Sequence, residues 1–235
     1  MRTETLIDGV REQTKLLLHS VPIKCDAQFE FIVQHPFTQS PWVSSHGGEI
    51  IDLRTNEGYE KWVNIIESEI DKMDLYSIFH ILIVKAWNLT WLRFVKPFLS
   101  VEDFSKLLRY AWIEEENPNM DANVSTTMAI SWFKEADNKF LMTEDDYEYW
   151  ESLPEDIVLY RGVSNGRKKY GLSWTDNKEK AMWFQSRFET DVKKGFLLKV
   201  KVNKKHCLCY FNCRNEKEIV LDVNAVKKDI EDITE

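Results

Sequence analysis

No stretch of this 235-residue sequence is apolar for long enough to form a membrane-spanning helix. The most apolar segment, residues 75–99, is interrupted by Lys85, Arg93 and Lys96. A helix inside a bilayer tolerates few such charges, so we expect one or two buried helices here instead. The amphipathic segment 1–20 has no apolar core followed by small residues, and we therefore expect a cytoplasmic protein rather than a secreted or membrane-bound one.

Cysteine is also scarce, and three of the four cysteines fall within "HCLCYFNC", residues 206–213. Thiolates and imidazole bind zinc, but the C-x-C-x3-C spacing is not that of the common zinc knuckles, and no second cluster completes it. The pattern favours reduced structural cysteines, as is usual in the cytoplasm, over a metal site.

The charge of the chain is divided unevenly along its length. Residues 1–150 hold 14 basic and 25 acidic side chains, whereas residues 151–235 hold 17 basic and 14 acidic ones. A basic C-terminal part suits a phosphate-bearing ligand, although a mildly basic surface also occurs without one. The sequence contains no direct signal for nucleic-acid binding.

The periodicity of the apolar residues changes from helical to strand-like near Pro154. Helix signals mark residues 1–20, 58–73, 75–95, 101–113, 128–137 and 143–153, and a short strand is expected at 29–33. Ser100 and Thr143 are predicted N-caps. These patterns predict a mostly helical region over residues 1–153, packed together with a mostly β region over 154–235 as one compact α+β unit.

The C-terminal region contains five expected strands and one expected helix. The strands are "DIVLYRGV" (156–163), "GLSWT" (171–175), "GFLLKVKVN" (195–203), "HCLCYF" (206–211) and "EKEIVLDV" (216–223). The helix covers residues 177–188, with Asp176 as its cap. Trp183 and Phe184 on this helix are expected in the core because Ala181, Phe184 and Phe188 follow helical spacing.

Three short motifs occur in order within this region: Tyr160-Arg161-Gly162, Ser173-Trp174-Thr175 and Glu216-Lys217-Glu218. An aromatic-Arg-Gly strand, a Ser-x-Thr strand that leads into a helix, and a Glu-x-Glu strand together resemble the mono-ADP-ribosyltransferase family. The closest likeness is to its Arg-Ser-Glu branch, which includes arginine-modifying bacterial toxins and phage enzymes. The resemblance covers about residues 156–224 and implies a split β-sandwich that binds NAD.

The resemblance implies a role for each catalytic position. Glu218 would stabilise the oxocarbenium-like ribose that forms when nicotinamide leaves, and Ser173 would hydrogen-bond Glu218 or the ribose. Arg161 would bind the pyrophosphate through its planar fork. Glu216 would receive and activate an acceptor guanidinium, and we expect the two glutamates to share a strand face because side chains repeat every two residues.

The resemblance also implies further ligand contacts around these positions. The backbone of Gly162 would contact nicotinamide, with Thr175 and Trp174 beside the cofactor. Trp174 departs from the family's usual Ser-Thr-Ser motif, and the sequence leaves open whether it packs in the core or contacts nicotinamide. Phe211 and Asn212 would contact the acceptor.

The resulting expectation is transfer of ADP-ribose from NAD to a protein side chain, with arginine favoured. The acceptor would be a bacterial host protein, in a toxin or phage–host setting. Two alternatives stay open: hydrolysis of NAD, and an inactive binding protein built on the same fold.

Overall fold

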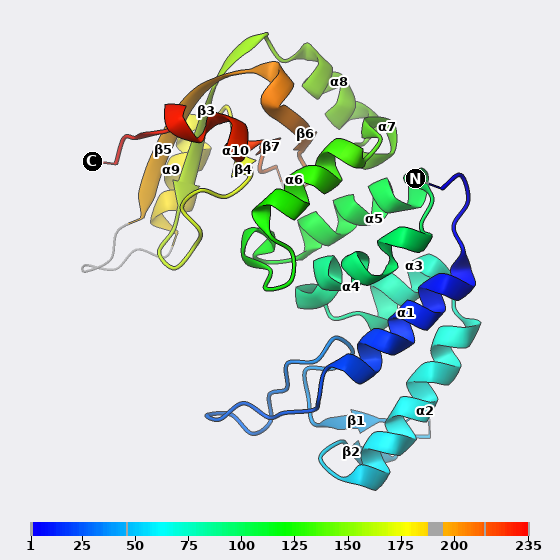
Figure 1. The fold of residues 1–235 in the computed structure, drawn as a ribbon. Helices are drawn as coiled ribbons and strands as arrows, with labels where there is room; N and C mark the ends of the chain where they lie inside the picture. Colours follow the sequence, from blue (N-terminus) through cyan, green and yellow to red (C-terminus); the bar gives the residue numbers. More distant parts are fainter. Residues whose placement is uncertain (1, 46, 188–194, 214, 235) are drawn as a thin grey trace. The chain divides into compact units, whose positions relative to one another are not determined.

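The computed structural model describes residues 2–45, 47–187, 195–213 and 215–234. The chain is α+β, with helices and small antiparallel sheets. It divides into two compact units: residues 1–104 with 110–116, and residues 105–109 with 117–235. The expected boundary at 153/154 therefore falls inside the second unit, which contains several helices as well as the C-terminal strands (Figure 1).

The first unit is mainly helical. Its elements are α1 (Ile7–Ser20), β1 (Trp42–Ser44), β2 (Ile50–Asp52), α2 (Asn56–Lys72), α3 (Leu75–Ser77), the π-helical turn η1 (Ile78–Leu82), the 3-10 turns η2 (Lys85–Trp87) and η3 (Lys96–Phe98), α4 (Asn88–Val95) and part of α5 (Val101–Glu114). The strand expected at 29–33 is wrong: Val33 forms only an isolated bridge with Cys25.

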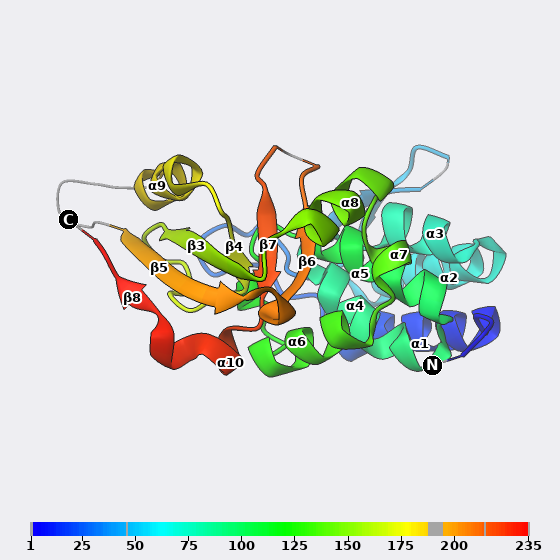
Figure 2. The ribbon, with the colours of Figure 1, turned by 90° about the horizontal axis from the view of Figure 1, so that it is seen from above.

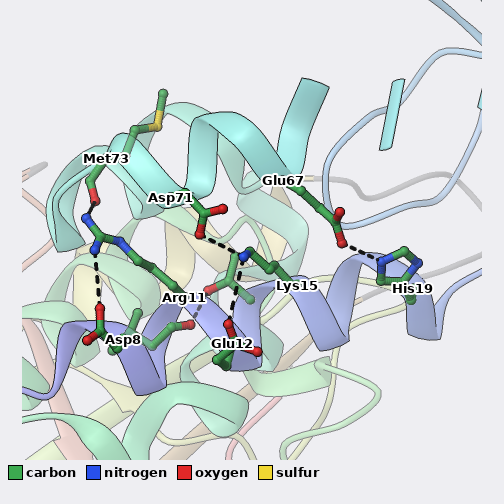
Figure 3. Close-up of polar contacts among 10 residues, drawn as sticks. Asp8, Arg11, Glu12, Lys15, His19, Glu67, Asp71 and Met73 are labelled. Atoms are coloured by element: carbon green, nitrogen blue, oxygen red, sulfur yellow. Dashed lines mark hydrogen bonds and ion pairs between the residues drawn. The ribbon is translucent and has the colours of Figure 1, made fainter. Parts of the chain in front are cut away.

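Helices α1 and α2 lie side by side and bury their apolar faces. Leu18 of α1 and Trp62 of α2 belong to one buried cluster, which also includes Ile51 of β2. At the edge of this contact, Lys15 pairs with Asp71 at 2.7 Å (Figure 3). Exposed ion pairs contribute little to stability, so apolar burial is the main force that holds these helices together.

The apolar segment 75–99 is folded as several short pieces rather than as one long helix. Ile83 and Val84 are extended and separate η1 from the helical turns that follow. Helix α4 is buried around most of its circumference, with Leu89, Trp91 and Leu92 fully enclosed. Among the residues that the structure describes, no helix combines the length and the apolar character needed to cross a membrane.

His35 in the first unit is completely buried as a neutral imidazole. Its Nδ1 accepts a hydrogen bond from the Phe37 N–H at 3.2 Å, so the ring proton is on Nε2, which lies 3.3 Å from the Leu18 carbonyl. The Trp62 ring covers it edge-on. Burial lowers the pKa of His35 to about 4, because a charged imidazolium would lose its hydration and would turn a second N–H toward a donor.

This burial predicts an acid-sensitive first unit. The unfolded chain takes up a proton near pH 6.5 and the folded chain only near pH 4, so the stability present above pH 6.5 is lost as the pH falls toward 4. We expect His35 to account for a loss of about 2 kcal/mol between pH 7.5 and pH 5. Urea unfolding of wild type and His35→Gln across this range measures it. The exposed His19→Gln variant is the control, and equal pH slopes for wild type and His35→Gln would contradict the prediction.

Two predicted N-caps are confirmed, and a third differs by one residue. The Ser100 hydroxyl accepts from the Asp103 N–H at the start of α5, and the Thr143 hydroxyl accepts from the Asp146 N–H at the start of α8 (Glu144–Ser152). The cap of α9 (Lys178–Ser186) is Asn177, not Asp176.

The second unit combines helices with two three-stranded antiparallel sheets. Its further elements are the 3-10 turns η4 (Pro118–Met120), η5 (Lys204–His206) and η6 (Lys227–Asp229), α6 (Thr126–Glu135), α7 (Asn138–Leu141), α10 (Val223–Val226), β3 (Asp156–Val163), β4 (Ser173–Trp174), β5 (Phe196–Asn203), β6 (Cys207–Phe211), β7 (Glu218–Leu221) and β8 (Glu231–Asp232). The strand orders are β3-β5-β8 and β4-β7-β6.

A backbone bridge joins β3, an edge strand of one sheet, to the end of β4, an edge strand of the other. Tyr160 of β3 and Thr175, just after β4, exchange backbone hydrogen bonds of 2.7 and 2.9 Å. Helix α9 lies against β3 and β5 (Figure 2). Its outer side is exposed: Trp183 is 54% accessible, so its expected place in the core is wrong. Phe184, also expected in the core, is half-buried, and Ala181 is buried. Phe188 lies outside the described residues.

Candidate functional site

Arg161 occupies the core-facing side of β3. Burial alternates along this strand, and Arg161 falls in line with the buried Leu159 and Val163. A guanidinium in such a position needs hydrogen-bond partners, because an unpaired buried charge is strongly destabilising. Burial lowers the pKa of Arg161 to about 10, and the nearby negative charge of Glu218 acts in the opposite direction.

The partners of Arg161 are backbone carbonyls of the loop that leads into β4. Its Nε donates to the Lys169 carbonyl at 3.2 Å, its Nη2 to the Lys168 carbonyl at 2.9 Å, and its Nη1 to the Ser173 carbonyl at 2.6 Å. The fork expected to hold a pyrophosphate is thus turned toward the protein itself. In this structure Arg161 shapes the loop and fixes the backbone at Ser173.

Gly162 allows α9 to lie directly on β3. A Cβ at this position would sit 1.7 Å from the Ala181 carbonyl oxygen and 2.6 Å from the Gln185 nitrogen. The backbone of the helix fills the space that any side chain would need. The glycine expected to contact nicotinamide is therefore required for close packing of helix against strand.

Strand β4 presents Ser173 and buries the two residues that follow it. Trp174 is 2% exposed, and its Nε1 donates to the Gly171 carbonyl at 2.9 Å, so the tryptophan packs in the core. Thr175 is also buried, and its hydroxyl accepts from the Asn177 N–H at 3.2 Å in the turn before α9. Of the two alternatives left open for Trp174, the structure favours packing in the core, and Thr175, expected beside the cofactor, is buried as well.

Glu218 is the first residue of β7 and shares a face with Ser173. Ser173 pairs directly with Val220, and Glu218 lies two residues before Val220, so the three side chains lie on one side of the pair. Residues related in this diagonal way have Cα atoms about 7–8 Å apart, a gap that a glutamate side chain can span. Glu218 is half-buried. Burial raises the pKa of the Cys209 thiol on neighbouring β6, and the negative charge of Glu218 raises it further.

Glu216 does not share the strand with Glu218, and the expectation of a common strand face is wrong. Strand β7 begins only at Glu218, and Lys217 between the two has a left-handed φ of 50°. Strand alternation therefore does not apply to this pair. Glu216 belongs to the loop that joins β6 to β7.

Of the two residues expected to contact the acceptor, Phe211 is buried and Asn212 is exposed. Phe211, at the end of β6, is 1% exposed, and its ring centroid lies 6.4 Å from that of Phe133. Asn212 is exposed, but its side-chain oxygen accepts from the Lys217 N–H at 3.2 Å, and its carbonyl accepts from the Asn215 N–H at 2.9 Å. Asn212 thus stabilises the hairpin loop.

Asn119 is a site residue that the sequence patterns miss. It lies in the turn η4, far from the three motifs in sequence, and its Nδ2 donates to the Ser173 hydroxyl at 2.9 Å. Its Oδ1 accepts from the Leu172 N–H at 2.5 Å. Gly171 leaves room for this contact: a Cβ there would sit 2.8 Å from Asn119 Oδ1 and 2.4 Å from Arg161 Nη2. A single asparagine in a loop carries no periodic or motif signal.

Two cysteines of the 206–213 segment, Cys207 and Cys209, lie on β6. Cys207 and Cys209 are buried, free thiols, and burial raises the pKa of Cys207 to about 12. Over the part of the chain that the structure describes, no group of three or more His, Cys, Asp or Glu side chains is arranged to hold a metal ion.

Comparisons with protein-family models, with curated proteins and with solved structures find no match to this chain.

Proposed function

We propose that this protein cleaves the bond between nicotinamide and ribose in NAD and transfers the ADP-ribose to a protein side chain. Arginine is the acceptor that the sequence resemblance favours, on a bacterial host protein in the cytoplasm. The observation that carries this proposal is that Arg161, Ser173 and Glu218 lie on the neighbouring strands β3, β4 and β7. The Arg161 fork donates to the Ser173 carbonyl at 2.6 Å, and Ser173 and Glu218 share a face of the β4–β7 pair.

The sheet arrangement supports the same proposal. Two small antiparallel sheets, linked through Tyr160 and Thr175, are compatible with the split β-sandwich that the resemblance implies. The motifs lie on β3, on β4 and at the start of β7, as the Arg-Ser-Glu order requires.

The chemistry follows from the position of Glu218. Loss of nicotinamide leaves positive charge on the ribose, and a fixed carboxylate at that point stabilises the charge in the transition state. Ser173 orients the carboxylate. Arg161 acts indirectly, because its hydrogen bond to the Ser173 carbonyl fixes the backbone of Ser173. Arg161 is thus proposed as a positioning residue, not as a ligand of the phosphates.

Hydrolysis of NAD is the second candidate, and one observation favours it. Glu216, the residue expected to activate an acceptor guanidinium, lies outside β7 and is separated from Glu218 by the left-handed Lys217. Without a functional residue at this position, water would replace the protein acceptor.

Incubation with NAD labelled in its adenylate part, together with bacterial extract, tests the proposal and separates the candidates. Wild type is expected to release nicotinamide and to label protein, with arginine identified by mass spectrometry. We expect Glu216→Gln to reduce labelling at least about 10-fold while nicotinamide release continues, because only acceptor activation is removed. Nicotinamide release without any labelled protein identifies a hydrolase, and absence of both reactions excludes the proposal in favour of an inactive binding protein.

A further inference from the structure

The orientation of the Asn119 amide is fixed by its neighbours. The Leu172 N–H can only donate, so the atom 2.5 Å away must be the carbonyl oxygen of Asn119. The amide nitrogen then necessarily faces the Ser173 hydroxyl, 2.9 Å away, and donates to it. The two contacts exclude the flipped amide.

This orientation decides what the Ser173 hydroxyl can do. A hydroxyl has one hydrogen to donate, and a donor that already points at its oxygen leaves that hydrogen directed elsewhere. The Ser173 carbonyl is occupied separately, by Arg161. On the face that Ser173 shares with Val220 and Glu218, the acceptor with a negative charge is the Glu218 carboxylate.

We infer that Asn119 is a positioning residue for NAD cleavage: by donating to Ser173, it commits the serine hydroxyl to donate to Glu218. This inference rests on the proposed function and extends it to a residue outside the three motifs. The side-chain hydrogen bonds of Asn119 are to Leu172 and Ser173, both within the protein. Its effect therefore reaches the reaction only through Ser173.

Asn119→Asp reverses the polarity of one contact and keeps the other. A carboxylate at this position still accepts from the Leu172 N–H, but it accepts from the Ser173 hydroxyl as well and turns its hydrogen away from Glu218. We expect kcat for nicotinamide release to fall by about 100-fold, as for a misplaced catalytic group, with KM for NAD within about twofold of wild type. Asn119→Ala, which removes both contacts, repeats the test if Asn119→Asp fails to fold.

The control is a surface contact of the same kind. Asn224 donates through Nδ2 to the Thr127 hydroxyl at 3.2 Å in an exposed position, and Asn224→Asp is expected to leave kcat unchanged. In a Ser173→Ala background, Asn119→Asp should have no further effect on kcat, because the group it acts through is gone.

The outcomes separate this inference from the proposed function. An active wild type whose kcat falls with Asn119→Asp, but not in the Ser173→Ala background, supports it. An active wild type in which Asn119→Asp changes only KM, or lowers kcat equally in both backgrounds, overturns the inference and leaves the proposed function intact. A folded wild type that cleaves no NAD overturns both.

Discussion

Replacing Glu218 with glutamine is expected to lower the rate of nicotinamide release by about 10³-fold, the upper end of what loss of one preorganised electrostatic group costs. Glutamine has nearly the same shape and keeps an acceptor oxygen for the hydrogen bond proposed from Ser173, so the change removes mainly the negative charge. Because that charge stabilises the ribose cation only as the bond breaks, NAD affinity should change little. Single-turnover release of nicotinamide gives the rate, and calorimetry gives the dissociation constant.

The matched control for this variant is Glu231→Gln, at an exposed glutamate on β8. It is expected to cleave NAD at the wild-type rate. If Glu218→Gln retains more than about a tenth of wild-type activity, Glu218 is not the group that stabilises the transition state, because loss of such a group costs at least about 100-fold.

Replacing Arg161 with methionine is expected to lower the free energy of unfolding by about 3–5 kcal/mol, the usual cost of removing one partner from a buried charged network. Three backbone carbonyls would lose their donor, and the charge of Glu218 would lose a nearby cation. Arg161→Lys should also be destabilising, because an ammonium cannot reproduce a planar fork and burial lowers the pKa of lysine as well.

Guanidinium unfolding followed by circular dichroism measures this loss of stability, and hydrogen exchange locates it. Amides of residues 164–173 should exchange faster in Arg161→Met than in wild type, because Arg161 fixes the carbonyls of this loop. Arg54, an exposed residue paired with Asp52, provides the control, and Arg54→Met should leave stability close to wild type. Wild-type stability and unchanged exchange in Arg161→Met would mean that the carbonyl contacts do not hold the loop.

Much of the fold could be predicted from the sequence, because local patterns determine helix starts and alternating strands. The sequence predicts Ser100 and Thr143 as caps, and both have that role, because each hydroxyl accepts from a backbone N–H that the start of a helix leaves unpaired. Strand β3 agrees with its predicted range, 156–163. The predicted strand face for the two glutamates is wrong because Lys217, which lies between them, has a left-handed backbone that no sequence pattern indicates.

The candidate site was predictable only in its motif positions. The order of Arg161, Ser173 and Glu218 was visible in the sequence, but the direction of the Arg161 side chain was not, because nothing local shows which carbonyls a long cation will meet. Trp183 is large and apolar, as core residues usually are, but it lies on the exposed side of α9. The role of Asn119 could not be predicted, because only the tertiary structure brings its distant turn next to Ser173 of β4.

The close approach of α9 to β3 has a consequence for how this protein can vary over evolution. With 1.7 Å between the Ala181 carbonyl and the place of a Cβ on residue 162, even alanine requires the helix to move away from the strand. A lineage that replaced Gly162 would also have to shift the position of α9 relative to β3. Glycine next to Arg161 is therefore a more selective marker for finding distant homologues than the arginine alone.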